Sequence, residues 1–115
     1  GAVLAFGSDS PVEDLNVMIG IHAAVTRRRA DGSPGPEGWY PEQRLSVTEA
    51  VRAYTAGAAY ASGEEDLKGT LSPGKLADLV VLSLDIFTIE PMAILETEVV
   101  ATMLDGGFVY TREEL

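Results

Sequence analysis

The sequence lacks cysteine altogether and has a single histidine, His22, among its 115 residues. The absence of cysteine excludes a disulfide framework and a thiolate-ligated metal site. The single histidine excludes a His-x-His pair.

Positive charge is scarce as well. Lys and Arg total 8 against 18 Asp and Glu, which gives a net charge of −10. A chain this acidic repels phosphate backbones and anionic membrane surfaces, so we expect no nucleic-acid partner and no membrane partner. No apolar run reaches the roughly 20 residues of a membrane span, and residues 1–6 lack the basic leader of a signal peptide. We expect a cytoplasmic location.

The apolar content is that of a folded chain. Hydrophobic residues make up 46% of the sequence, which predicts a globular structure and argues against disorder. The run Ala2–Phe6 has no alternation and predicts a fully buried strand. A strand that begins at residue 2 needs partners on both sides, so we expect the protein to continue upstream of Gly1.

The turn Gly7–Pro11 precedes a helix whose start has two interpretations. Ser10 is a possible N-cap, with Pro11 at the first helical position and Glu13 completing a capping box. Alternatively, Asn16 caps a helix that continues through Arg28. Either interpretation places one apolar face on the helix at the spacing of Val17, Ile21, Ala24 and Val25.

A long loop and a second helix follow. Residues 31–43 hold three Gly and three Pro around the pair Trp39-Tyr40, and a loop of this length is typical of functional segments. Ser46 and Glu49 form the capping box of the next helix, which Gly63 ends. Its apolar stripe is Val47, Ala50, Val51, Tyr54, Ala58 and Ala61.

The last third of the chain predicts β-structure. We expect a short strand at 68–71, a type II turn at 72–75 with Pro73 and Gly74 at its centre, and a central strand at 78–83. Residues 91–95 predict a helical turn. Segments 99–104 and 108–111 flank Asp105-Gly106-Gly107, which indicates a hairpin.

Six ordered motifs carry a family resemblance nearly from end to end. They are Gly7-Ser8-Asp9 with Pro11-Val12, Gly20–Arg27, Trp39-Tyr40-Pro41, Ala53-Tyr54-Thr55, Lys68-Gly69-Thr70-Leu71, and Pro73–Leu79. In this order they resemble the C-terminal part of the amidohydrolase superfamily, in its YtcJ-like branch. The resemblance implies an α/β fold: the C-terminal fragment of a (β/α)8 barrel with part of a small β-sandwich. Residues 1–66 would hold the last barrel strand and its helices, and residues 67–115 the C-terminal sandwich portion of a composite domain.

The resemblance also implies an activity. Amidohydrolases bind one or two divalent metals, with zinc the expected ion here, and hydrolyse C–N bonds of small molecules, for this branch an amide or N-formyl bond, with metal-activated water. Their ligands are a His-x-His pair, a carboxylated Lys or a Glu, two further His, and an Asp after strand eight. Only the last has a counterpart here, Asp9, which would be metal ligand and catalytic proton acceptor. A catalytic zinc site takes three protein ligands, so the chain alone is expected to bind no metal and to be inactive.

Each candidate residue has a structural interpretation too. Asp9 is alternatively a helix cap or turn residue. The pair Trp39-Tyr40 either lines a substrate cleft or packs its loop onto the barrel. His22 is expected to be a packing or surface residue rather than a ligand.

The remaining charged residues have structural interpretations, and the chain as a whole has an alternative function. Residues 27–29, three arginines, predict a solvated helix end in preference to a carboxylate-binding site, and Asp78 predicts a turn hydrogen bond. The alternative function is a non-catalytic α+β module for interaction or self-association. Exposed apolar surface predicts a homo-oligomer in either case.

Overall fold

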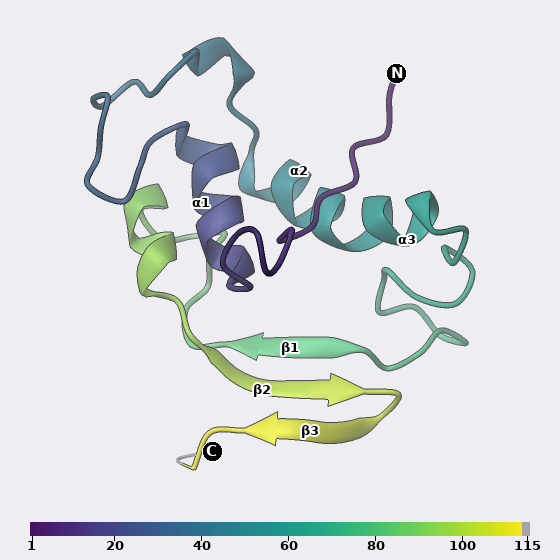
Figure 1. The fold of residues 1–115 in the computed structure, drawn as a ribbon. Helices are drawn as coiled ribbons and strands as arrows, with labels where there is room; N and C mark the ends of the chain where they lie inside the picture. The colour runs from purple at the N-terminus through teal and green to yellow at the C-terminus, as the bar shows by residue number, and fades with distance from the viewer. Residues whose placement is uncertain (114–115) are drawn as a thin grey trace. The chain divides into compact units, whose positions relative to one another are not determined.

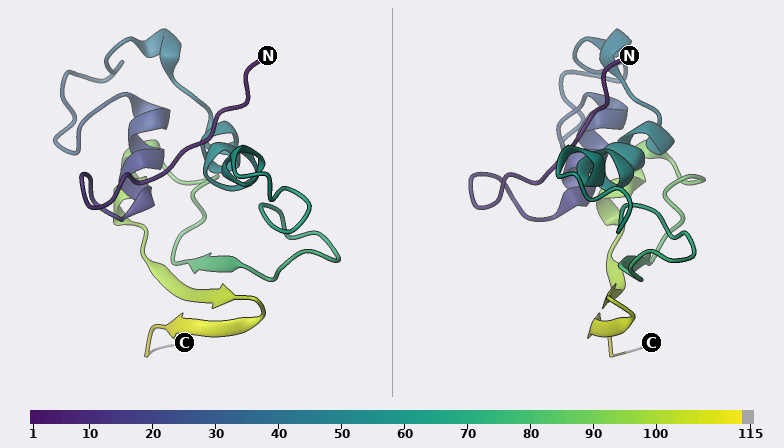
Figure 2. Two further views of the ribbon diagram at one scale, coloured as in Figure 1. Left: turned by 45° about the vertical axis from the view of Figure 1, so that its right-hand side comes forward. Right: turned by 90° about the vertical axis from the view of Figure 1, so that its right-hand side faces the viewer.

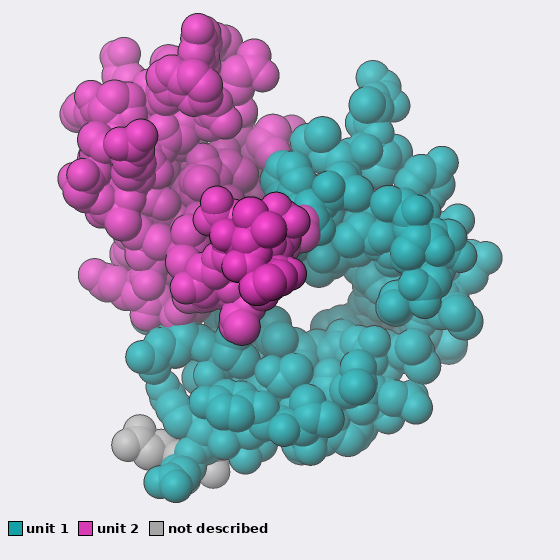
Figure 3. Space-filling view, in the orientation of Figure 1, with its two compact units in different colours: residues 1–6, 53–84, 98–115 teal, residues 7–52, 85–97 magenta. Residues whose placement is uncertain are grey.

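The computed structural model describes residues 1–113 (Figure 1). Contacts divide the chain into two compact units, coloured separately in Figure 3. Unit 1 comprises residues 1–6, 53–84 and the described part of 98–115, and unit 2 comprises residues 7–52 and 85–97. No helix in the described part of the chain combines the length and the apolar character that crossing a membrane requires.

Unit 2 begins with helix α1, Val17–Thr26. Its N-cap is Asn16, whose side-chain oxygen accepts a hydrogen bond from the Met18 N–H at 3.0 Å. The helix ends because Arg27 adopts the left-handed conformation, with φ 55°, and donates its N–H to the Ala23 carbonyl at 2.8 Å. Of the two predicted starts, the Asn16 cap is confirmed and the Ser10 cap is wrong.

The core of unit 2 forms where α1 packs against helix α2, Val47–Arg52, and the 3-10 helix η3, Pro91–Glu96. The capping box of α2 is confirmed: the Glu49 N–H donates to Ser46 Oγ at 3.1 Å, and the Ser46 N–H donates to Glu49 Oε2 at 2.8 Å. The helical turn predicted at 91–95 is confirmed as η3. The buried apolar side chains of this unit are Met18, Ile21, Ala50, Ile86 and Ile94.

His22 belongs to this core, as the packing interpretation predicted. It is only 2% exposed. Its Nε2 lies 3.2 Å from Met92 Sδ and 3.5 Å from Thr26 Oγ1, and that hydroxyl donates to the His22 carbonyl at 2.8 Å. Burial, and next the positive charge of Arg28, lower the pKa of His22. The imidazole is therefore held neutral as a packing group.

In unit 1 the helix that continues from α2 departs from regular α geometry. Segment η2, Ala53–Gly57, is a π-helix and is followed by α3, Ala58–Ala61. The Ala53 carbonyl accepts a hydrogen bond from the Phe6 N–H at 3.0 Å, and the Phe6 ring meets Tyr54 edge to face with centroids 5.4 Å apart. The apolar stripe of the sequence carried no sign of this π segment, because its side chains suit either helix.

Two predicted strands are wrong. Residues 2–6 form no strand, and nearly all of them are exposed. A strand exists only through pairing, and no strand in residues 1–113 pairs with this segment; its Phe6 is fixed by η2 instead. Residues 68–71 form no strand, and residues 68–70 are bends. The chain turns back here, so that the Leu76 N–H donates to the Leu67 carbonyl at 2.8 Å.

The β-structure of unit 1 is a three-stranded antiparallel sheet in the order β1-β2-β3 (Figures 1 and 2). The strands are β1, Leu79–Leu82, β2, Val99–Leu104, and β3, Gly107–Thr111. The hairpin predicted around residue 105 is confirmed, and Asp78 makes the expected turn contact by accepting the Asp105 N–H at 2.8 Å. The prediction that 78–83 is central is wrong: β2 is central, because apolarity indicates burial but not a strand's place in a sheet.

The connection between α3 and β1 depends on a close approach at Gly69. Its φ is 99°, and a Cβ placed there would lie 2.8 Å from Ala59 Cβ and 3.1 Å from Ala56 Cα. The loop thus lies directly on the small side chains of η2 and α3, which explains why this helix is rich in alanine. Gly74, in the confirmed turn at 72–75, also has a positive φ, 90°, but nothing lies within 4 Å of a Cβ there.

Alanine substitutions at these two glycines distinguish the cost of backbone strain from the cost of steric overlap. Gly69→Ala is expected to lower the free energy of unfolding by about 2–4 kcal/mol, because it adds overlap with the helix to left-handed strain. The matched control Gly74→Ala adds the strain alone and should cost about 1–2 kcal/mol. Urea unfolding followed by circular dichroism measures both. Equal losses for the two variants would contradict the close packing at Gly69.

The buried histidine predicts a pH dependence of stability. Its pKa is lower in the folded chain than the usual 6.5, so the unfolded chain binds the proton more readily. Stability is therefore full above about pH 6.5 and falls as the pH drops toward the folded-state pKa, with a slope of at most about 1.4 kcal/mol per pH unit.

The control for this effect is His22→Gln, which removes the titrating group and retains polarity. Urea unfolding between pH 7.5 and about 5 should show a smaller loss of stability for His22→Gln than for the unmodified chain. Parallel pH profiles would mean that folding does not lower the pKa of His22.

Candidate functional site

Asp9 lies in a tight turn of unit 2. Its φ of 57° places it in the left-handed region, and its carbonyl accepts hydrogen bonds from the Val12 N–H at 2.8 Å and the Glu13 N–H at 3.1 Å. Asp is one of the few side chains that tolerate this conformation. The residue is exposed, and its carboxylate makes no hydrogen bond or ion pair within residues 1–113. The turn is therefore held by the Asp9 backbone, and the carboxylate remains available for a contact outside the turn.

The described residues do not form a metal site among themselves. No group of three or more His, Cys, Asp or Glu side chains in residues 1–113 is arranged to hold an ion. His22, the sole imidazole, is buried against Met92. Asp9 could supply one oxygen ligand, and a catalytic zinc site takes three protein ligands. The donor set of this chain therefore does not fit a complete metal centre.

The pair Trp39-Tyr40 lies beside the C-terminal end of α1. The two rings pack edge to face with centroids 4.7 Å apart. The guanidinium of Arg27 lies over the Trp39 ring at 5.0 Å, its Nε donates to the Trp39 carbonyl at 3.0 Å, and the Trp39 N–H donates to the Arg27 carbonyl at 2.9 Å. Both aromatic residues remain more than half exposed, Trp39 at 61% and Tyr40 at 56%.

Gly38 permits this return of the loop. Its φ is 83°, and a Cβ there would lie 2.2 Å from the Thr26 carbonyl oxygen. No other residue could bring the backbone so close to the end of α1. The loop 31–43, which also contains the short 3-10 helix η1, Pro41–Gln43, is therefore closed onto the helix rather than free.

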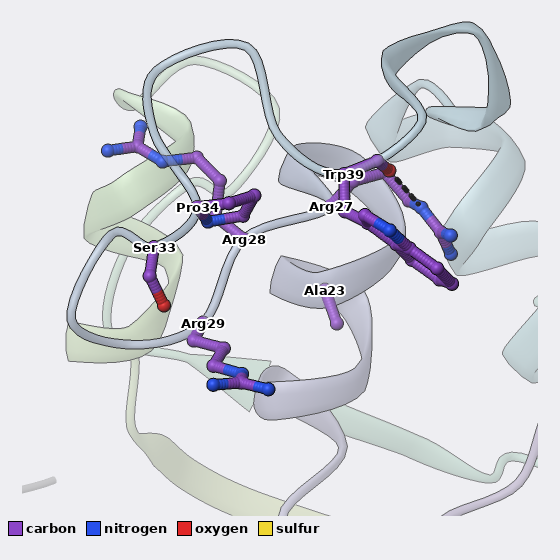
Figure 4. A pocket seen from close by; sticks show the side chains of 7 residues that line it. All are labelled: Ala23, Arg27, Arg28, Arg29, Ser33, Pro34 and Trp39. Carbon is purple, nitrogen blue, oxygen red and sulfur yellow. Dashed lines mark hydrogen bonds between the residues drawn. The ribbon is translucent and has the colours of Figure 1, made fainter.

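The closed loop and the end of α1 surround a hollow of about 490 Å³. Figure 4 shows the side chains that line it: Ala23, Arg27, Arg28, Arg29, Ser33, Pro34 and Trp39. The sequence predicts a solvated helix end for the three arginines and treats the aromatic pair as a separate feature, whereas the structure brings them together. Gly38 was the sequence signal for this contact, because it allows the loop that contains the aromatic pair to pack against the arginines at the end of α1. Asp9 is not among the lining residues.

Comparisons of this chain with known proteins find the amidohydrolase family and its relatives. The model of the amidohydrolase family matches residues 1–110. The amidohydrolase-family protein YtcJ of Bacillus subtilis is 35% identical over 97% of this chain, and the protein LONG AFTER FAR-RED 3 of Arabidopsis thaliana is 39% identical over 95%. An N-substituted formamide deformylase of Arthrobacter pascens is 30% identical over 97% of the chain.

The fold agrees with the same family. The crystal structure of an amidohydrolase from Thermotoga maritima superposes with a TM-score of 0.68 at 25% identity, covering 97% of this chain and 24% of that protein. The chain spans about a fifth of the length of the curated relatives, 21%, 18% and 20% in the order given above. The family match over residues 1–110, in a mixed α/β structure with a three-stranded antiparallel sheet, shows that the chain belongs to the amidohydrolase family.

Proposed function

We propose that this chain forms the C-terminal part of a metal-dependent hydrolase that cleaves a C–N bond, of the amide or N-formyl type, in a small molecule. The observation that carries the proposal is Asp9: an exposed carboxylate without a partner in the described residues, presented by a left-handed turn inside the family-matched segment. The similarity to an N-substituted formamide deformylase supports the bond type.

In this proposal Asp9 is the general base and then the general acid of the reaction. It accepts a proton from the attacking water and passes it to the departing amine, which is the general acid–base role of a carboxylate within hydrogen-bond reach of both. It also contributes one ligand to a divalent metal, zinc by our expectation, whose other ligands lie outside this chain. The isolated chain accordingly has no hydrolytic activity and no tightly bound metal of its own.

The division of the chain follows the same proposal. Residues 1–66 belong to the end of a (β/α)8 barrel, and residues 67–115 belong to the β-sandwich of a composite domain. The distribution of elements supports this: the helices α1 to α3 all fall in the first segment, and the strands β1 to β3 all fall in the second. The exposed pair Trp39-Tyr40 is proposed to contact the small-molecule substrate.

A second candidate function is self-association. Strand β3 forms an edge of the described sheet and is exposed along its whole length. Phe108, Val109 and Tyr110 are 60%, 64% and 49% exposed. An exposed apolar edge strand is a template for pairing with another chain. These features favour a homodimer or higher oligomer in which β3 lies at the contact.

The role of Asp9 is tested by Asp9→Asn in the full-length protein that contains this chain. Removing the proton acceptor while retaining size should lower kcat for an N-formyl amine or amide substrate by about 10²–10⁴-fold. The matched control is Glu13→Gln, an exposed carboxylate of the same segment, which should leave kcat unchanged. Unchanged kcat in Asp9→Asn, with a folded circular dichroism spectrum, would refute the assignment.

Self-association is tested by light scattering on the 115-residue chain at micromolar concentration. We expect a dimer or larger species, and we expect Val109→Lys to shift it toward the monomer because a charge on an edge strand opposes pairing. The control is Leu71→Lys, a loop residue that is 71% exposed in the same unit. A clean monomer of the unmodified chain would count against this function.

A further inference from the structure

The hollow at the end of α1 concentrates the positive charge of an acidic molecule. Of the 8 Lys and Arg residues in the chain, three line this one hollow: Arg27, Arg28 and Arg29. The ion pairs of the described residues lie elsewhere, between Lys68 and Glu64 and between Arg112 and Glu98. The three arginines therefore give the hollow a positive potential, and none of them forms an ion pair with a carboxylate within residues 1–113.

Two of the three arginines are fixed by backbone carbonyls. Arg27 Nε donates to the Trp39 carbonyl at 3.0 Å, and Arg28 Nε donates to the Gly32 carbonyl at 3.0 Å. Figure 4 shows that their guanidinium groups lie apart, with Arg29 at another side of the hollow. The guanidinium of Arg29 has no hydrogen-bond partner within residues 1–113, so all of its donors are available.

One carboxylate lies near Arg29, and it is already engaged. Asp31 Oδ1 accepts the Ser33 N–H at 2.9 Å. Hydrogen bonds from the Ser33 backbone and hydroxyl, with a smaller contribution from Arg29, hold the pKa of Asp31 below its usual value. Asp31 is exposed and belongs to the turn of its own loop, and it forms no ion pair with Arg29 within residues 1–113.

Apolar surface lines the same hollow as Arg29. Trp39 lines the hollow and is 61% exposed, and its indole N–H has no partner in the described part of the chain. Ala23 and Pro34 add further apolar surface. A hollow lined by both a flat indole and an unpartnered guanidinium suits a ligand that has a planar body and an anionic group. Aromatic faces stack, and guanidinium binds carboxylate or phosphate in bidentate fashion.

We propose that this hollow binds a small organic anion, with its carboxylate or phosphate group on Arg29 and its planar body against Trp39. The volume of about 490 Å³ is within the range of small-molecule sites. The site does not depend on the proposed hydrolysis, because it lies wholly within unit 2 and does not include Asp9.

Trp39 is the only tryptophan of the chain, so its indole N–H gives one isolated signal in a ¹H–¹⁵N NMR spectrum of the 115-residue protein. The probes are benzoate, phenyl phosphate, neutral benzamide and inorganic phosphate. We expect saturable shifts of the indole signal with benzoate or phenyl phosphate, and affinity at least about fivefold weaker for benzamide. Preference between benzoate and phenyl phosphate identifies the anionic group, and saturation by inorganic phosphate alone, with equal affinity, would overturn the requirement for a planar body.

Arg29→Met tests the charge at the site. It should weaken binding of the better anionic probe by about fivefold or more, and Arg29→Lys, which keeps the charge but loses the planar fork, should fall between the two. The matched control is Arg52→Met, which removes an exposed positive charge at the end of α2 and should leave binding unchanged. Equal affinities for Arg29→Met and the unmodified chain, or no indole shift with either anion at millimolar concentration, would overturn the proposal.

Discussion

The packing of α1 against α2 and η3 is the contact on which unit 2 depends. It buries Ile94 completely, along with His22 from the opposite helix. Because α1 is fixed in this way, both of its ends are fixed as well. The Asn16 cap fixes where α1 begins after the turn that contains Asp9. The left-handed conformation of Arg27 fixes where α1 ends. The two proposed sites of this unit therefore lie on the segments that flank a single helix.

The end of α1 shows how much depends on one glycine. Gly38 lets the loop approach the Thr26 carbonyl, and that approach places Trp39 against Arg27. Without it, the arginines would be the solvated helix end that their sequence suggests. A cluster of cations acquires a binding surface only when another segment supplies a wall, and here that wall comes from a residue 12 positions along the chain.

Local signals in the sequence predicted much of the secondary structure. The Asn16 cap, the Ser46–Glu49 capping box and the Asp105-Gly106 hairpin were all readable, because each depends on residues within a few positions of one another. The strand expected at 2–6 failed because apolarity indicates burial and not pairing. The π segment η2 and the edge position of β1 could not be read, since both are set by contacts between distant parts of the chain. For the site, the family resemblance predicts Asp9, whereas the hollow depends on contacts between the end of α1 and the loop 31–43 that no local pattern indicates.

The role proposed for Asp9 rests on family membership and on the donor set of this chain. The chain belongs to the amidohydrolase family, yet residues 1–113 bring together no set of three metal-ligating side chains. We therefore propose that Asp9 is one ligand of a metal centre completed by residues outside this chain. The most direct test is to sequence the reading frame upstream of Gly1 and to measure the intact mass of the expressed protein. We predict an upstream frame that encodes a His-x-His pair and a mass well above 12.2 kDa. A stop codon or unrelated sequence upstream, with a mass of 12.2 kDa, would contradict it.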